Sequence, residues 1–157
     1  MHSVAYRAAG IDEIDLIRPL WEQLNEHHHM KASFFRKHYE RMTFGDRKLH
    51  FLRLHESGYL RIDLAQDTMT GDYIGYCVCS VSADKTGEVE SLFVNATYRS
   101  AGIGTALVTR GLAWMDSLGT VMKRVSVGNG NEPAWMFYRK FGFYPRMMVL
   151  EQIPDPD

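Results

Sequence analysis

At 157 residues the chain is long enough to bury one hydrophobic core, since domains typically hold about 100–150 residues. No apolar run approaches the roughly 20 residues that cross a bilayer, which excludes a membrane-spanning helix. The 18 Lys and Arg residues nearly balance the 19 Asp and Glu residues, so the net charge of −1 gives no overall attraction to nucleic acid or to an anionic membrane. We expect a single domain over residues 1–152, a frayed tail over residues 153–157, and neither a nucleic acid nor a membrane as partner.

The N-terminus and the cysteines indicate the compartment. Residues 1–7 lack the basic segment and apolar stretch of a secretory signal, so we expect a cytoplasmic protein. Cys77 and Cys79 share one face of an expected strand, too close together for an unstrained disulfide. We expect two buried free thiols, which fit a reducing compartment.

The first part of the chain reads as a short strand followed by helices. A strand is expected over residues 4–7, and apolar residues at spacings of three and four predict a helix from Asp12, which is a plausible N-cap. Pro19 should kink this helix or mark its true first turn. A second helix is expected over residues 33–42 and a third ends at Gly58. The apolar faces of the first two helices are formed by Ile14, Ile17, Leu20, Trp21 and Leu24, and by Phe34, Phe35, His38, Tyr39 and Met42.

The second part of the chain alternates strands with helices. Strands are expected over residues 59–65, 73–81, 88–94, 121–127 and 143–150, and helices over residues 103–118 and 133–140. This order implies an antiparallel meander followed by strand–helix–strand crossovers, which make later strands parallel. The fold class is therefore α/β with a mixed, twisted sheet.

A glycine-containing loop lies between the strand that ends near residue 94 and the helix that follows. A loop in this position aims backbone N–H groups beyond the strand end, and the helix start adds partial positive charge. Glycine lets the backbone approach phosphate oxygens closely and adopt positive φ. The pattern predicts a cradle for a pyrophosphate, formed by Arg99, Ser100, Ala101, Gly102, Ile103, Gly104 and Thr105.

A dinucleotide-binding loop is the competing interpretation. That motif requires the spacing G-x-G-x-x-G. Gly102 and Gly104 are followed by Leu107 where the third glycine should stand, so this interpretation is rejected.

Two motifs in the right order resemble the GCN5-related N-acetyltransferase (GNAT) superfamily. Arg99, Gly102 and Gly104 match its R/Q-x-x-G-x-G/A loop. The downstream signature N-x-x-A-x-x-x-Y-x-x-x-G-F is matched by Asn131, Ala134, Tyr138, Gly142 and Phe143. The resemblance implies a mixed sheet of about six to seven strands flanked by about four helices, with two splayed strands that form a groove for acetyl-CoA. It implies an N-acetyltransferase whose cosubstrate is acetyl-CoA and which needs no metal.

The resemblance also implies roles for individual residues. Pantetheine would lie between residues 92–94 and 125–127, with a backbone N–H of Phe93 or Val94 on the thioester oxygen, and the glycine loop would hold the pyrophosphate. Asn131 would bond the pantetheine amides, cap its helix, or do both. Arg99 would contact phosphate, although an exposed arginine at a loop edge needs no ligand, and Arg139 and Lys140 would reach the 3′-phosphate.

Tyr138 and Glu90 are the two candidate catalytic residues. A phenol stays protonated at neutral pH, so Tyr138 can act as a general acid toward the leaving thiolate; the alternative is an aromatic residue that only packs with Phe137 and Phe141. Glu90 is the carboxylate best placed to receive the amine proton, because it should share strand parity with Leu92 and Val94. A surface carboxylate, or an anchor for a cationic acceptor, is an equal alternative. Glu88 shares the parity but should lie further from the cosubstrate.

Partners and rival classes follow from the same residues. His27, His28 and His29 point about 100° apart on a helix, so we expect no metal site and place them at the acceptor mouth. The acceptor is expected to be a small-molecule or protein amine, and a homodimer is expected because similar small acetyltransferases often pair through their last strands. A non-catalytic acyl-CoA sensor is the rival, and the presence of both Tyr138 and Glu90 disfavours it.

Overall fold

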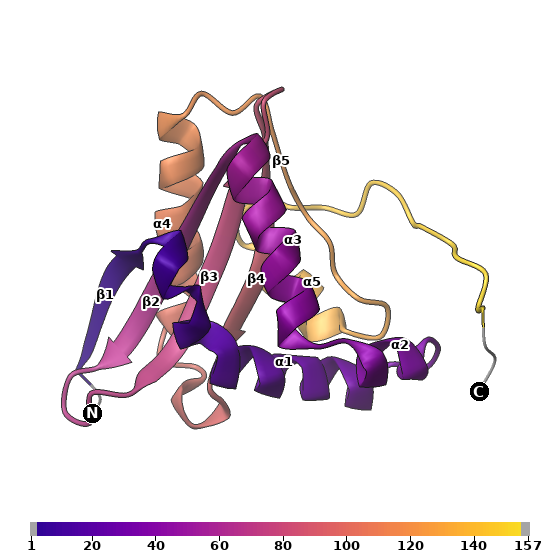
Figure 1. Ribbon diagram of the computed structural model, residues 1–157, viewed down its shortest axis with the longest axis horizontal. Helices are drawn as coiled ribbons and strands as arrows, with labels where there is room; N and C mark the ends of the chain where they lie inside the picture. Colours follow the sequence, from indigo (N-terminus) through magenta and orange to yellow (C-terminus); the bar gives the residue numbers. More distant parts are fainter. Residues whose placement is uncertain (1–2, 155–157) are drawn as a thin grey trace.

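The computed structural model describes residues 3–154 and has five strands and five α-helices in that range (Figure 1). A 3₁₀ helix, η1, precedes α1, and a second one, η2, follows β4. The elements in chain order are β1 (Val4–Ala9), η1 (Ile11–Ile17), α1 (Arg18–Lys31), α2 (Arg36–Arg41), α3 (Phe44–Ser57), β2 (Tyr59–Asp67), β3 (Tyr73–Val81), β4 (Thr86–Val94), η2 (Ala96–Tyr98), α4 (Ile103–Ser117), β5 (Met122–Val125) and α5 (Glu132–Arg139).

The sheet follows the chain order, β1-β2-β3-β4-β5. The first four strands are antiparallel neighbours, and β5 pairs with β4 in parallel after the crossover through α4. The expected meander and parallel crossover are thus confirmed. A short turn joins β2 to β3, which makes the expected hairpin.

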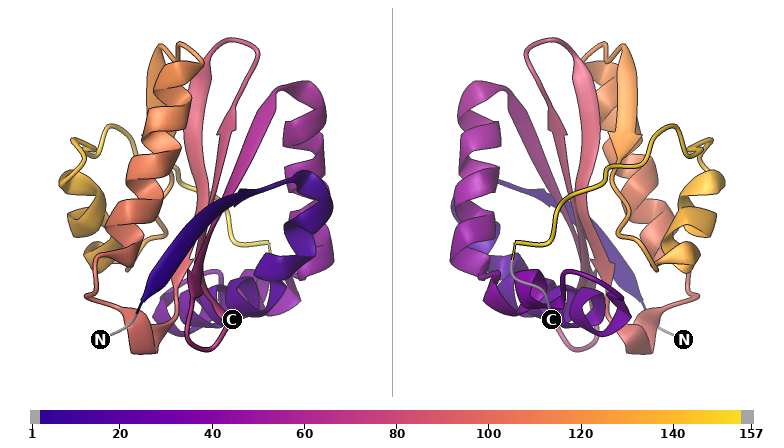
Figure 2. Two further views of the ribbon diagram at one scale, coloured as in Figure 1. Left: turned by 90° about the vertical axis from the view of Figure 1, so that its left-hand side faces the viewer. Right: turned by 90° about the vertical axis from the view of Figure 1, so that its right-hand side faces the viewer.

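Helices cover both faces of this sheet, with η1, α1 and α3 on one face and α4 and α5 on the other (Figure 2). Each face has its own apolar cluster, because strand residues alternate between the two faces. We call them the α3 face and the α4 face. Fully buried members on the α3 face include Ile14, Ile17, Phe51, Tyr76 and Val78, and those on the α4 face include Cys77, Ile103, Leu107, Val108 and Met115.

Pro19 stands in the first turn of α1, where its missing N–H costs no helical hydrogen bond. The second of the two expectations for this proline is therefore confirmed. Asp12 is not the N-cap as expected, since Gly10 occupies that position before η1 and no side chain caps it. The 3₁₀ segment shifts the α-helix start to Arg18, beyond the reach of Asp12.

The expected helix over residues 33–42 is shorter, and of its expected apolar face only Met42 packs against the α3-face core. Phe35 adopts a left-handed conformation with φ of 61°, which stops a helix from forming before Arg36. Phe34 is 61% exposed, and no residue of α2 is fully buried. This segment connects α1 to α3 instead of filling the core.

The expected strand over residues 143–150 does not form, and the expected strand over residues 121–127 shortens to β5. The sheet has five strands among the described residues, fewer than the six to seven expected. A strand needs a hydrogen-bonded neighbour, and this segment meets none among residues 3–154. The segment runs past the β5 edge without pairing, as Figure 2 shows. Of the tail expected over residues 153–157, residues 155–157 lie outside the described range.

The two cysteines are buried free thiols, as expected. Their sulfur atoms lie 3.6 Å apart on the α4 face. No helix in the described range is both long enough and apolar enough to cross a membrane.

Candidate active site

Strands β4 and β5 separate halfway along β4. Their last paired residues are Val89 and Val125, and β5 ends there. From Glu90 to Val94, β4 is paired only with β3 among the described strands, so the backbone groups of its other edge have no strand partner. This divergence produces the splayed strands that the resemblance implies, and it leaves the outward-facing backbone groups of residues 90–94 for another extended group.

A bulge in β4 lies at the same point. The register passes from Val89 opposite Cys79 to Ser91 opposite Val78, so Glu90 is the extra residue. The expectation that Glu90 shares a face with Leu92 and Val94 is therefore wrong. Leu92 and Val94 pack on the α4 face, whereas the Glu90 carboxylate turns to the α3 face. One inserted residue reverses the alternation of side chains.

The Glu90 carboxylate is held by neighbours on β3 and α3. The Ser80 hydroxyl donates to its Oε1 at 2.7 Å, and His50 Nε2 lies 3.6 Å from its Oε2. The Glu90 side chain is only 7% exposed, while the His50 side chain is 43% exposed. Burial, together with nearby Arg47, lowers the pKa of His50, so this imidazole is mainly neutral near pH 7.

Glu88 lies opposite Ser80 and beside Arg124, whose Nε is 3.4 Å from its carboxylate. Burial raises the pKa of Glu88 to about 7, and the charge of Glu90 adds to the rise while Arg124 opposes it. Because this pKa lies near neutral pH, Glu88 can exchange a proton there, which an isolated surface carboxylate cannot do.

The predicted cradle leads into the N-terminus of α4. Gly102 has φ of 78° and Ser100 has φ of 67°, so the loop turns sharply before the helix. No side chain caps α4, and its first backbone hydrogen bond within the helix runs from Ala106 to Gly102. The preceding N–H groups, those of Ile103, Gly104 and Thr105, therefore have no partner within the helix. The loop is exposed, which suits an anion from solvent.

Arg99 does not point freely into solvent. Its Nε donates to the Val94 carbonyl at 3.2 Å, and its guanidinium lies 5.4 Å from the centre of the Phe93 ring. These contacts fix the charge between the end of β4 and the cradle. The terminal nitrogens of Arg99 keep donors that a phosphate could accept from.

Helix α5 packs against the start of α4 and carries Tyr138. Phe137 lies 3.5 Å from where a side chain at Gly104 would begin, so the glycine allows the two helices to meet. Asn131 occupies the N-cap position of α5, but its side chain makes no capping bond. The capping role expected for Asn131 is wrong, and its amide remains for another partner. The buried Trp135 Nε1 also has no hydrogen-bond partner among the described residues.

Tyr138 is 7% exposed and makes edge contacts with Phe137 and Phe143. Burial and the nearby Cys77 raise its pKa well above the usual range, so the phenol keeps its proton at any physiological pH. The packing interpretation concerns the ring of Tyr138 and the acid interpretation concerns its hydroxyl. The two are compatible, because the ring packs against Phe137 and Phe143 and the hydroxyl has no hydrogen-bond partner among residues 3–154.

The histidines at the end of α1 diverge, as their spacing predicts. His28 stacks on Tyr39, whereas His29 faces Glu40 at 3.0 Å and Glu26 at 3.9 Å. Within the described range, no three His, Cys, Asp or Glu side chains form a group that could hold a metal ion. Tyr39 lies near Gly128 and so brings α2 close to the loop after β5.

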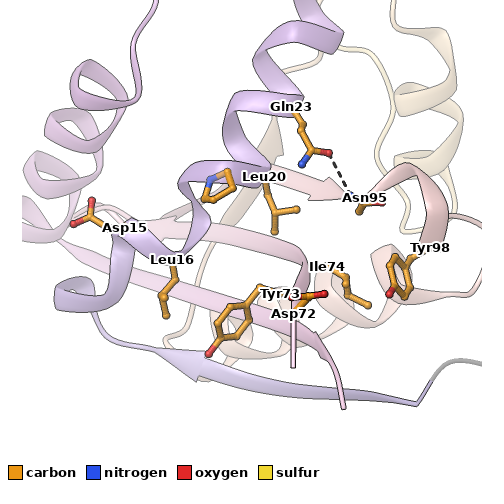
Figure 3. Close-up of a pocket in the computed structure, with 10 residues that line it drawn as sticks. Asp15, Leu16, Leu20, Gln23, Asp72, Tyr73, Ile74, Asn95 and Tyr98 are labelled. Atoms are coloured by element: carbon orange, nitrogen blue, oxygen red, sulfur yellow. Dashed lines mark hydrogen bonds between the residues drawn. The ribbon is translucent and has the colours of Figure 1, made fainter. Parts of the chain in front are cut away.

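A separate cavity of about 510 Å³ lies beyond the end of β4, between α1 and the start of β3 (Figure 3). Gln23 accepts a hydrogen bond from Asn95 at 3.3 Å across it. None of the sequence-predicted site residues lines this cavity. Two of its lining residues, Asn95 and Tyr98, lie just before the cradle in the sequence. The charged residues that line the cavity, Asp15 and Asp72, are not buried.

Ser80, His50 and Arg47 were missed from the sequence. Arg47 donates to the backbone carbonyl of Glu90 at 2.6 Å, the carbonyl that the bulge frees from the ladder. No spacing in the sequence relates α3 to β4, because their contact depends on how the helix lies across the sheet. The only signal was the polar Ser80 in an otherwise apolar strand.

The fold has a mixed sheet with a splayed strand pair, and a glycine loop that leads into an uncapped helix. These features are those of an acyltransferase fold. The chain belongs to the Acetyltransferase (GNAT) family, whose model matches residues 18–143. An uncharacterised N-acetyltransferase of Methanocaldococcus jannaschii is 26% identical over 87 residues, which are 52% of this chain and 38% of that protein. The match thus spans well under half of that relative.

Solved structures agree on the fold. A Trypanosoma brucei acetyltransferase superposes with a TM-score of 0.66 at 18% identity, over 96% of this chain and 100% of that one. The aminoglycoside N-acetyltransferase AAC(6′)-Iy, solved in complex with CoA, gives 0.67 at 16% identity, over 94% and 97%. Identities this low establish the architecture and leave the acceptor open.

Proposed function

We propose that this protein is an acetyl-CoA-dependent N-acetyltransferase that transfers an acetyl group to a primary amine by direct attack in a ternary complex. The observation that carries the proposal is the divergence of β4 and β5 at Val89, with an uncapped α4 N-terminus beyond it and the Glu88–Glu90 pair beside it. An extended thioester that lies along the free edge of β4 would pass these three features one after another.

The residues present fit the cosubstrate. Its pyrophosphate would lie on the cradle over residues 99–105, where unpaired N–H groups and the charge of Arg99 await an anion. Its pantetheine amides would bond the free edge of β4 at Phe93 or Val94 and the side chain of Asn131. That the AAC(6′)-Iy structure contains CoA supports a shared binding mode on the same fold.

The chain's own groups can supply both proton transfers. The Glu88–Glu90 pair would accept the ammonium proton, and the partly exposed His50 would pass it to solvent. The amine nitrogen then attacks the thioester carbonyl carbon, the C–N bond forms, and the C–S bond breaks. Tyr138 would donate its phenolic proton to the departing sulfur. The proton that the attacking nitrogen still carries would then return to the Tyr138 oxygen, directly or through water, which leaves a thiol, an amide and a protonated tyrosine.

The test has two stages. Calorimetry should first show that acetyl-CoA binds to the folded protein. Release of free thiol should then follow when primary amines are added, and mass spectrometry should find the acetylated amine. No heat of binding at millimolar acetyl-CoA overturns the proposal, whereas binding without thiol release for any amine would identify a non-catalytic sensor.

Three further assignments belong to this proposal. The acceptor is a small-molecule or protein amine. The protein works in the cytoplasm, which the buried free thiols of Cys77 and Cys79 support. It works as a homodimer, which the unpaired segment after α5 supports through its exposed apolar side chains.

A further inference from the structure

Among residues 3–154, Arg47 on α3 is a cation that forms no salt bridge with a carboxylate. It is half-buried, and among the described residues its one hydrogen bond goes to the neutral carbonyl of Glu90. The guanidinium also lies over the Phe51 ring at 4.7 Å, which covers one of its faces. An arginine offers five N–H donors, so most of its hydrogen-bonding capacity is unused.

The position of Arg47 matters as much as its pairing. The bond to the Glu90 carbonyl places the guanidinium at the bulge, where β4 and β5 have just separated. Arg47 and His50 are three residues apart on α3 and so share the helix face that lies over β4. The Glu88 and Glu90 carboxylates are on the same face of the sheet.

Partial burial of the Arg47 guanidinium without a salt bridge costs solvation free energy. Desolvation lowers the pKa of Arg47 more than the nearby Glu90 and Glu88 raise it, although the guanidinium remains charged. The carboxylates that could neutralise Arg47 are committed elsewhere, since Glu90 binds Ser80 and Glu88 lies against Arg124. An anionic group from a ligand would satisfy Arg47 where the protein does not.

The site therefore has opposite charges at its two ends. The carboxylate pair attracts an amine, and Arg47 attracts an anion next to it. We propose that Arg47 binds the carboxylate of the acceptor, and that the acceptor is an amino acid whose amine meets the Glu88–Glu90 pair. This inference rests on the proposed acetyl transfer and narrows its substrate class.

The same charges disfavour polyamines and aminoglycosides as acceptors. Each would bring a second ammonium group against Arg47, and like charges at a half-buried position repel. Arg124 is a weaker candidate for the carboxylate, because it is 62% exposed and already lies near Glu88. The structural likeness to an aminoglycoside enzyme does not extend to this arrangement of charge, because it concerns the fold alone.

The experiment compares matched acceptors. Free amino acids and their carboxamides present the same amine, but only the former carry a carboxylate. We expect kcat/KM to favour the free amino acid by about tenfold to a hundredfold, the worth of a hydrogen-bonded ion contact. Carboxamides acetylated equally well or better would overturn the inference.

Variants locate the effect. Arg47→Gln should raise KM for amino acids by about tenfold or more and change kcat/KM for carboxamides by less than about threefold, and Arg47→Lys should retain part of the preference. The exposed Arg53→Gln on the same helix is the matched control and should change neither. An equal loss of kcat/KM for amino acids and carboxamides would mean that Arg47 stabilises the β4 bulge or positions the acyl group. That result would refute the carboxylate subsite.

A binding measurement separates this inference from the proposed reaction. In the presence of CoA, calorimetry should show that an N-acetyl amino acid binds more tightly than its carboxamide, and that Arg47→Gln removes this difference. If no amine of either class releases thiol, the reaction is refuted while the binding preference still decides the role of Arg47. If the two ligands bind alike, the subsite is refuted whether or not the enzyme turns over.

Discussion

Tyr138 combines a packed ring with a phenol that holds its proton tightly. We predict that Tyr138→Phe keeps the packing with Phe137 and Phe143 and removes only the proton donor. Turnover should fall at least about tenfold, within the range typical of a lost general acid, while acetyl-CoA affinity stays nearly unchanged. Steady-state kinetics and calorimetry on the same preparation check this. Wild-type turnover in Tyr138→Phe would leave the tyrosine a packing role only.

The Glu88–Glu90 pair should govern the acidic limb of the pH profile. Only an ionised Glu88 can accept a proton, so kcat/KM should rise with pH through a pKa near 7, the value to which burial raises Glu88. Glu88→Gln should remove this limb. Glu90→Gln removes a negative charge that helps to raise the Glu88 pKa, so the limb should move to lower pH.

The profile is measured at saturating acetyl-CoA, with Glu56→Gln, an exposed residue of α3, as the control. The Glu56 variant should reproduce the wild-type curve. A limb that stays near pH 7 in both Glu88→Gln and Glu90→Gln would assign the proton acceptor to another group.

Single residues of the site differ in how far the sequence could reveal them. Tyr138 and the glycines of the cradle match motifs of the GNAT family, so the resemblance was enough to predict them as site residues. The face on which Glu90 lies did not follow, because a bulge adds one residue and leaves no mark in the pattern. The role of Arg47 could not be predicted for a different reason. Its hydrogen-bond acceptor is the backbone carbonyl of Glu90, on a strand far away in the sequence.

At the scale of elements, α4 lies very close to β3. A side chain at Gly111 would begin 2.6 Å from the Cys79 sulfur, a distance too short for two such atoms. Gly111→Ala gains up to about 1 kcal/mol of helix propensity, but overpacking typically costs about 1–3 kcal/mol. We predict a net loss of stability, measured as the free energy of unfolding in urea.

The clash can be relieved from the other side. Cys79→Ala removes the sulfur, so the double variant should be more stable than the sum of the two single changes implies. Gly45→Ala on α3 is the control, because its nearest atom lies 3.7 Å away and the substitution should be neutral or stabilising. If the free energy of unfolding of Gly111→Ala is no lower than that of the wild type, α4 and β3 are not tightly packed at this position.

Elements whose partners are near in sequence were predicted well, and the others were not. Strand β3 spans the expected residues 73–81, and α4 ends before Gly119, whose φ of 71° suits a residue after a helix. The segment over residues 33–42 failed because one left-handed residue, Phe35, delays the helix. The spacing of apolar residues cannot reveal a left-handed backbone conformation at a phenylalanine, a residue that rarely adopts it.

At the scale of the whole molecule, the chain leaves an apolar segment uncovered. Residues 144–150 extend away from the body beside the β5 edge, in yellow in Figure 1. Consecutive exposed apolar side chains are rare on monomers and mark surfaces that contact another molecule. The residues concerned are Met147, Met148, Val149 and Leu150, which are 76%, 80%, 74% and 86% exposed.

A second copy of the chain could cover the apolar side chains of the segment and pair with the free edge of β5. Within the part of the chain that the structure describes, residues 143–150 pair with no strand and β5 has a neighbour on one side only. Two copies related by a twofold axis could each cover the other's segment, since such an interface is self-complementary. We predict a dimer at about 100 μM protein, measured by light scattering during size-exclusion chromatography.

Charge placed in the segment should separate the copies. Met148→Glu with Leu150→Glu puts two carboxylates on the same side of an extended chain, and burying them in an interface costs more than the contact returns. We expect monomers of this variant with an unchanged circular dichroism spectrum, because neither side chain belongs to the core. Met69→Glu, an equally exposed methionine on the β2–β3 turn, should remain dimeric. A wild-type monomer, or a dimer that survives both glutamates, would show that another surface or no surface joins the copies.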